Sequence, residues 1–162
     1  MAPQIWLLRH GDAEAHGERD DASRRLTARG EDQARAAGAA LARLELGLES
    51  VLTSPRVRAR ETARLACAPL DLEPEVHEPL SGGFSREDAL AVLAGANPEA
   101  RLLLVGHEPD FSQLLYDFAG ARADVKKGGV AGLRVARGAG ELLALLRPRE
   151  LEAIAAGSGR LG

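Results

Sequence analysis

Histidines and arginines lie just after three short apolar runs of this sequence. The run QIWLL is followed by Arg9, His10 and Gly11, and the run RLLLVG is followed by His107. A third run, SVLTS, is followed by a proline and then by alternating arginines, of which Arg58 is the second. An imidazole nitrogen can attack an electrophile or carry a proton, and guanidinium groups bind the oxygens of anions through paired hydrogen bonds. Together these residue types predict a phosphate pocket.

Arg58 carries an indication of anion binding of its own. Ser54-Pro55 is expected to open a helix, because proline is favoured in the first helical turn, and this places Arg58 in that turn. A cation there is unfavourable by roughly a few tenths of a kcal/mol, since the helix N–H groups carry partial positive charge. A bound phosphate would reverse that sign. Arg56 and Arg60, in the same series, are as readily explained by a solvated helix face.

The elements predicted around these residues alternate between strand and helix. Thr27 is a candidate N-cap for an alanine-rich helix, and Ser85 with Asp88 at capping-box spacing is a candidate start for another. The predicted strands are residues 4–8, 50–54, a brief one around Val76, and 101–107, followed by a hairpin after Gly128. The predicted helices follow Thr27, Pro55, Ser85 and Pro109, with a short C-terminal helix from about Arg149.

This alternation is typical of an α/β layered domain. In such a sheet, ligands bind beyond the carboxyl ends of the strands. Two histidines and two arginines, His10, His107, Arg9 and Arg58, therefore converge on one edge if their strands are parallel. A chain of 162 residues suits one domain with its own core, and it has neither an internal repeat nor a long linker. Residues 1–162 are expected to form a single domain.

The composition excludes several classes of protein. Hydrophobic residues make up 45% of the chain, and 21 Lys and Arg against 24 Asp and Glu give a net charge of −3. With three Phe, one Trp and one Tyr, neither the charge nor the aromatic content favours nucleic acid as a partner. The sequence has no stretch that predicts a membrane span or a secretory leader. The single cysteine, Cys67, cannot form an internal disulfide, and a cytoplasmic location is expected.

Four segments in order resemble the histidine phosphatase superfamily, whose members are phosphoglycerate mutase-like. They are LLRHGDA at 7–13, RRLTARG at 24–30, SPRVRARET at 54–62 and VGHEPD at 105–110. The short length and the arrangement RHGDA…LT..G are most similar to the SixA-type phosphohistidine phosphatase branch. The resemblance runs from about residue 4 to 135. It implies a three-layer α/β/α fold with a mostly parallel central sheet and no large cap insertion.

The resemblance also implies a set of roles. His10 matches the family nucleophile, which forms a phosphohistidine intermediate, and its second ring nitrogen is expected to bind backbone; Gly11 allows a sharp turn there. Arg9 and Arg58 match the pair that binds the phosphoryl oxygens, and His107 matches the second histidine of the pocket. Arg24 matches an arginine that reaches the pocket rim in the SixA branch. No metal or other cofactor is expected, because the cationic side chains supply the positive charge.

The general acid does not follow from the resemblance. Mutase-type members carry a glutamate on a mid-chain loop, and Glu78 is the nearest match, although its surroundings depart from that motif. Asp12 and Glu108 are alternatives, and surface charge or helix capping is the favoured explanation for each candidate. A weakly provided acid fits a phosphoramidate substrate, whose leaving imidazole can be protonated by solvent.

Three functions therefore remain open at this point. The first is a phosphatase for phosphohistidine on a protein, and the second is a phosphatase for a small phosphomonoester, nucleotide or polyphosphate. The third is a phosphate-binding regulatory module with little turnover. The pair Lys126-Lys127 is interpreted either as steering an anionic substrate or as protecting a strand edge, and the edge role is favoured. His16 and His77 are expected on loops, with little contact with substrate.

Overall fold

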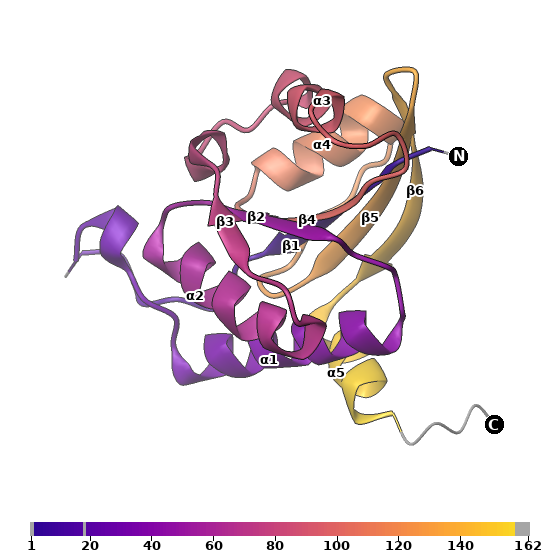
Figure 1. The fold of residues 1–162 in the computed structure, drawn as a ribbon. Helices are drawn as coiled ribbons and strands as arrows, with labels where there is room; N and C mark the ends of the chain where they lie inside the picture. Colours follow the sequence, from indigo (N-terminus) through magenta and orange to yellow (C-terminus); the bar gives the residue numbers. More distant parts are fainter. Residues whose placement is uncertain (1, 18, 158–162) are drawn as a thin grey trace.

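The structure of the protein is a computed structural model that describes residues 2–17 and 19–157. Strands and helices alternate through most of this part of the chain (Figure 1). Their bounds, in chain order, are β1 (Gln4–Arg9), α1 (Ala28–Arg43), β2 (Ser50–Thr53), α2 (Val57–Cys67), β3 (Pro74–Val76), α3 (Arg86–Ala94), β4 (Arg101–Gly106), α4 (Asp110–Ala119), β5 (Val130–Ala136), β6 (Ala139–Leu146) and α5 (Pro148–Ala156).

The six strands form one sheet in the order β3-β2-β4-β1-β5-β6. Strands β3, β2, β4 and β1 run parallel to one another, and β5 and β6 pair antiparallel at the other side. Leu7, in the middle of β1, is in register with Leu104 of β4 and with Ala131 of β5. The predicted mostly parallel sheet is confirmed.

Helices cover both faces of the sheet, as Figure 1 shows, with α1, α2 and α5 on one face and α3 and α4 on the other. Alternate residues of β1 supply the two cores. Ile5 and Leu7 pack in the cluster that includes α4, whereas Trp6 and Leu8 pack in the cluster that includes α1 and α2. A strand buried on both faces must be apolar throughout, which explains the unbroken run IWLL. The three-layer α/β/α architecture predicted from the resemblance is confirmed.

Local capping signals are found where the sequence predicts them. The Thr27 side chain accepts a hydrogen bond from the backbone N–H of Gly30 at the start of α1, and Ser85 and Asp88 form the predicted capping box of α3. The start of α2 is different, because the helix begins at Val57 rather than at Pro55. The Ser54 hydroxyl accepts a hydrogen bond from the N–H of Arg56, so the chain turns once before the helix begins.

Lys126 and Lys127 do not protect a strand edge. They precede β5, and β5 is paired with β1 on one side and with β6 on the other. The favoured edge interpretation is therefore wrong, because the strand that follows the lysines is internal to the sheet. In the part of the chain that the structure describes, we find no helix with the length and apolarity needed to span a bilayer.

Candidate active site

The three strand ends singled out in the sequence meet at one edge of the sheet. Strands β2, β4 and β1 are neighbours, and the backbone N–H of His10 donates to the carbonyl of Gly106 at 3.0 Å. The rings of His10 and His107 lie 5.2 Å apart, centroid to centroid. A pocket of about 570 Å³ opens here; among the residues that line it are His10, His107, Arg9, Arg24, Arg58, Glu14, His16, Asp21, Glu108 and Lys127.

His10 is held as a neutral ring with a defined tautomer. Its Nδ1 lies 2.7 Å from the carbonyl oxygen of Gly11, and since a carbonyl can only accept, Nδ1 carries the proton. Burial lowers the pKa of His10 to about 4, and the charges of Arg58, Arg9 and Lys127 act in the same direction, against the Gly11 hydrogen bond. The Nε2 atom therefore keeps a lone pair at neutral pH, which is the state a nucleophile requires.

Arg58 and Arg9 line the same pocket as this histidine. The Nε of Arg58 donates to Nε2 of His10 at 3.4 Å, and Arg58 is only 6% exposed. Arg9 donates from Nη1 to the carbonyl of Val125 at 3.1 Å. Burial lowers the pKa of both guanidinium groups, and two positive charges taken out of water favour an anion beside them.

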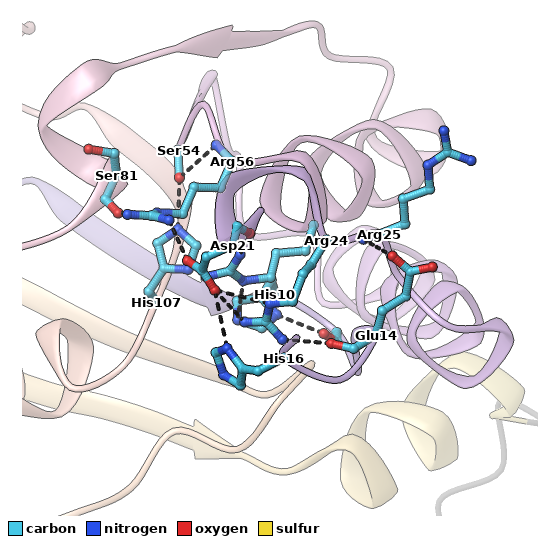
Figure 2. Close-up of polar contacts among 12 residues, drawn as sticks. His10, Glu14, His16, Asp21, Arg24, Arg25, Ser54, Arg56, Ser81 and His107 are labelled. Carbon is cyan, nitrogen blue, oxygen red and sulfur yellow. Dashed lines mark hydrogen bonds and ion pairs between the residues drawn. The ribbon is translucent and has the colours of Figure 1, made fainter. Parts of the chain in front are cut away.

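Asp21 organises the arginines around the pocket, although it is not among the site residues predicted from the sequence. Its backbone carbonyl accepts from Arg58 Nη1 at 2.7 Å, its Oδ2 accepts from Arg58 Nη2 at 3.3 Å, and its Oδ1 accepts from Arg24 Nε at 3.0 Å. Arg56 also donates to Oδ2. Figure 2 shows the Asp21 carboxylate among these side chains, with His16 beside it.

The charge of Asp21 is fixed by those arginines. Desolvation raises its pKa, but the charge of Arg58 and hydrogen bonds from Arg24 and Arg58 outweigh it, so the pKa is lowered. Asp21 binds the outer edge of the Arg58 guanidinium, through Nη1 and Nη2, and leaves Nε directed at His10. The three-residue spacing from Asp21 to Arg24 was the signal available in the sequence, since it permits a local ion pair.

His107 faces His10 across the pocket. Its Nε2 lies 2.7 Å from the hydroxyl oxygen of Ser54, whereas its Nδ1 is buried without a hydrogen-bond partner. Burial, followed by the nearby charges of His10, Arg58 and Arg56, lowers the pKa of His107 to about 3. Over the described residues, the other buried side-chain polar atom without a partner is Nε of Arg9. Both atoms belong to residues that line the pocket.

Close backbone packing fixes the turn that carries His10. A Cβ on Gly11 would lie 2.5 Å from the carbonyl oxygen of Gly30, and one on Gly30 would lie 1.9 Å from that of Asp12. Only glycine fits at either position, which brings the first turn of α1 against the loop after β1. The N–H of Gly11 donates to the hydroxyl of Thr62, which donates in turn to the carbonyl of Arg58.

Of the three candidate general acids, Asp12 and Glu78 lie outside the pocket that contains His10, and Glu108 lines it. Asp12 accepts a hydrogen bond from the Thr27 hydroxyl at 2.8 Å and lies 3.6 Å from Lys127 Nζ, and it is absent from the residues that line this pocket. Glu78 is exposed in the turn at Glu78–Ser81. Glu108 lines the pocket, but its two oxygens accept from the backbone N–H groups of Ser112 and Val125.

The other sequence-predicted residues divide between the pocket and its surroundings. Arg24 lines the pocket and also donates to the carbonyl of Glu14 at 2.7 Å. His16 lies at the mouth of the pocket with 80% of its side chain exposed. His77 packs edge-on against Phe84, with ring centroids 6.2 Å apart, and is not part of the lining.

Two facing imidazoles beside buried arginines, at one edge of a mostly parallel sheet, form an arrangement suited to phosphoryl transfer. Comparison with known proteins gives the same class. The family model of the histidine phosphatase superfamily (branch 1) matches residues 5–82. The chain belongs to this superfamily.

Particular relatives support phosphatase activity. The chain is similar to the protein histidine phosphatase SixA, solved with tungstate, at 26% identity and a TM-score of 0.81 over 91% of this chain and 99% of that one. It is 37% identical to an uncharacterized protein of Picosynechococcus sp. over 81% of this chain and 84% of the relative. It is 35% identical to the serine/threonine-protein phosphatase Pgam5 of Drosophila melanogaster over 72% of this chain, which corresponds to 37% of that protein.

Proposed function

We propose that this protein is a metal-independent phosphatase that works through a phosphorylated His10, and that its substrate is phosphohistidine on a protein. The observation that supports this most directly is the state of His10. A neutral ring offers the Nε2 lone pair beside Arg58. Arg9 and His107, each of which has one buried polar atom without a partner, line the same pocket. A phosphoryl group is the electrophile that such a set of donors recognises.

The first step is an in-line displacement at phosphorus. The lone pair of His10 Nε2 forms a bond to phosphorus, and the bond between phosphorus and the substrate nitrogen breaks with its electron pair going to the leaving imidazole. Arg9 and Arg58 neutralise the charge on the phosphoryl oxygens, and His107 binds a further oxygen. The carbonyl of Gly11 stabilises the positive charge that develops on His10, because it accepts from Nδ1.

The second step is hydrolysis of the phosphorylated His10. A water oxygen forms a bond to phosphorus, the bond to Nε2 breaks and returns its electron pair to His10, and the proton of the water passes to solvent. Inorganic phosphate leaves, and the neutral histidine is regenerated with its proton still on Nδ1.

The carboxylates around the pocket support a phosphoramidate substrate over an alcohol ester. Among the residues that the structure describes, the carboxylates that line the pocket are Glu14, Asp21 and Glu108. Hydrogen bonds, chiefly from the backbone of Arg25, lower the pKa of Glu14, Asp21 is held as an anion by arginines, and Glu108 accepts two backbone hydrogen bonds. An alkoxide leaving group needs a proton from such an acid, whereas the imidazole of phosphohistidine takes up a proton from solvent on its other ring nitrogen.

Two broader features belong to the same proposal. We infer that residues 1–162 act as one histidine phosphatase domain with a pocket open enough to admit a side chain of another protein. We also infer a cytoplasmic location, which suits the single buried thiol of Cys67.

The test compares kcat/KM for four substrates: a phosphohistidine protein, a phosphoserine peptide, a small phosphomonoester and p-nitrophenyl phosphate. We expect the phosphohistidine protein to be preferred, a chelator to have no effect, and acid-labile phosphate to be trapped on the protein. His10→Ala should remove turnover and trapping together, with an unchanged melting temperature as the control for folding. A preference for a phosphomonoester would indicate a small-molecule phosphatase instead. Phosphate binding without turnover would indicate a phosphate-binding regulatory module.

A further inference from the structure

A second hollow, which we call the basic groove, adjoins the pocket of His10. Its volume is about 530 Å³. Arg9 and Lys127 line both the groove and the pocket, so a ligand with a phosphoryl group at His10 reaches the groove directly. Within residues 2–17 and 19–157, one carboxylate, that of Asp12, lines the groove together with six cationic side chains: Arg9, Arg29, Lys126, Lys127, Arg147 and Arg149.

This local charge is opposite to that of the whole chain, whose net charge is −3. Carboxylates neutralise these cations in part. Glu150 accepts two hydrogen bonds from the Arg147 guanidinium, at 2.9 and 2.8 Å, so Arg147 is paired. The remaining contacts are longer: Arg149 lies 3.8 Å from Glu150, Lys126 lies 3.9 Å from Asp124, and Lys127 lies 3.6 Å from Asp12. Such loose pairs at exposed cations contribute little and exchange readily for other anions.

Two helix N-termini add to the positive potential of the groove. Helices α1 and α5 pack side by side (Figure 1), and Arg29 and Arg149 are the second residues of these helices. A cation in the first turn of a helix opposes the helix dipole. Each first turn also contains one acidic residue, Glu31 in α1 and Glu150 in α5, which offsets part of this cost. An anion bound in the groove would offset more of it.

The distribution of the cations indicates what kind of anion fits. They come from four separate segments: the end of β1, the start of α1, the turn before β5, and the start of α5. Most are exposed, with 49% of the Lys127 side chain and 77% of the Arg149 side chain accessible. A site for one phosphate group gathers its donors around a single point, often with buried side chains. Long, exposed cations spread around a 530 Å³ hollow instead suit several carboxylates presented along a protein surface.

We propose that the basic groove binds an acidic segment of the substrate protein, next to its phosphorylated residue. This inference rests on the proposed function, because it assigns the partner of the same pocket. The phosphoryl group enters beside His10, and Asp and Glu side chains of the flanking segment pair with Arg29, Arg149 and the lysines. Charge complementarity of this kind raises the rate of association and selects among phosphorylated partners.

The test uses two phosphohistidine peptides of equal length, one with Glu and one with Gln at the flanking positions. At low salt we expect kcat/KM to be at least tenfold higher for the Glu peptide, and the two peptides to converge at high salt. The double charge reversal Arg29→Glu with Arg149→Glu should remove this preference. The double reversal Arg60→Glu with Arg64→Glu is the matched control, because it changes the net charge equally at two exposed helical arginines that line neither hollow.

A binding measurement keeps this inference separate from the proposed function. An unphosphorylated Glu-rich peptide should bind the wild-type protein, and inorganic phosphate should not displace it. The double reversal should abolish this binding, even if the enzyme were to hydrolyse phosphomonoesters and no phosphohistidine. Equal kcat/KM for the Glu and Gln peptides, or absence of peptide binding, would overturn the proposal. The proposal would also be overturned if pyrophosphate or a nucleoside triphosphate were preferred over the Glu peptide and the double reversal removed that preference. The basic groove would then bind a second phosphate group.

Discussion

The Nε atom of Arg58 lies 3.4 Å from Nε2 of His10, and both side chains are more than nine-tenths buried. The donor of the arginine and the lone pair of the histidine therefore share one small volume before any substrate is present. When a phosphoryl group enters this volume, its contacts with Arg58 and His10 replace the long hydrogen bond between these two side chains. Because Arg58 is already positioned, little reorganisation is needed as charge develops in the transition state.

This relationship predicts that Arg58 is more important for catalysis than the other arginines of its series. Arg58→Ala should lower kcat/KM by about 10²–10³-fold, the range typical for loss of one donor to a developing charge. Arg56→Ala should have a smaller effect, since Arg56 reaches only Asp21 and the carbonyl of Ser81, and Arg60→Ala, at an exposed position, should have none. Steady-state kinetics on one substrate checks the order, and equal losses in all three variants would contradict it.

The two pocket histidines predict a dependence of stability on pH. Their pKa values of about 4 and about 3 in the folded state lie below the value near 6.5 of an unfolded histidine. The unfolded chain therefore binds more protons as the pH falls below about 6.5, so stability is complete above that pH and is lost on acidification. Each histidine should contribute about 1.4 kcal/mol per pH unit between pH 6 and 5.

The measurement is urea unfolding of the wild type and of His107→Gln at several pH values. Titration of carboxylates is common to both proteins and cancels in the difference. The variant should lose less stability than the wild type on going from pH 7.5 to pH 5. An NMR titration of the imidazole protons measures the pKa of each ring in the folded protein directly. A midpoint near 6.5 for either ring would contradict the prediction.

Residue pattern alone was sufficient for an α/β layered domain and for the parts of the pocket that follow strands, whereas the three-layer architecture was predicted from the family resemblance. His10 and His107 come directly after apolar runs, and a parallel sheet brings such ends together regardless of the loops between them. The pattern failed where a contact depends on the path of a loop. Asp21 lies in a charged segment without periodicity, and nothing in that segment specified that it folds back onto Arg58. Lys126 and Lys127 were misinterpreted because the sequence does not specify that β5 is inserted between β1 and β6.

Asp21 is expected to act through the arginines that it holds. Asp21→Asn retains the size of the side chain and removes its charge, so Arg58 and Arg24 lose an anionic partner and become less ordered. We expect kcat/KM to fall about tenfold, mostly in kcat, because Arg58 is then less well aligned in the transition state. Asp20→Asn, at the exposed neighbouring residue, is the control. If Asp21 instead competed with phosphate, the variant would bind inorganic phosphate more tightly and keep its kcat.

Thr62 connects the turn that contains His10 to the first turn of α2, which contains Arg58. Its hydroxyl accepts from the N–H of Gly11 at 3.1 Å and donates to the carbonyl of Arg58 at 2.7 Å, and the residue is fully buried. Thr62→Val preserves the shape of the side chain but leaves the Gly11 N–H without an acceptor, which should cost about 1–3 kcal/mol of stability. The freed turn also allows His10 to move relative to Arg58, so kcat should fall about tenfold at a temperature where the variant is folded.

Thr62→Ser separates these two effects. It restores the hydroxyl and removes one methyl group, so it should lose some stability through the small cavity but keep kcat close to the wild-type value. Thermal unfolding and kcat measured on all three proteins provide the comparison. If Thr62→Val and Thr62→Ser lose kcat equally, the side chain matters through packing, and the hydroxyl bridge between Gly11 and Arg58 does not position the nucleophile.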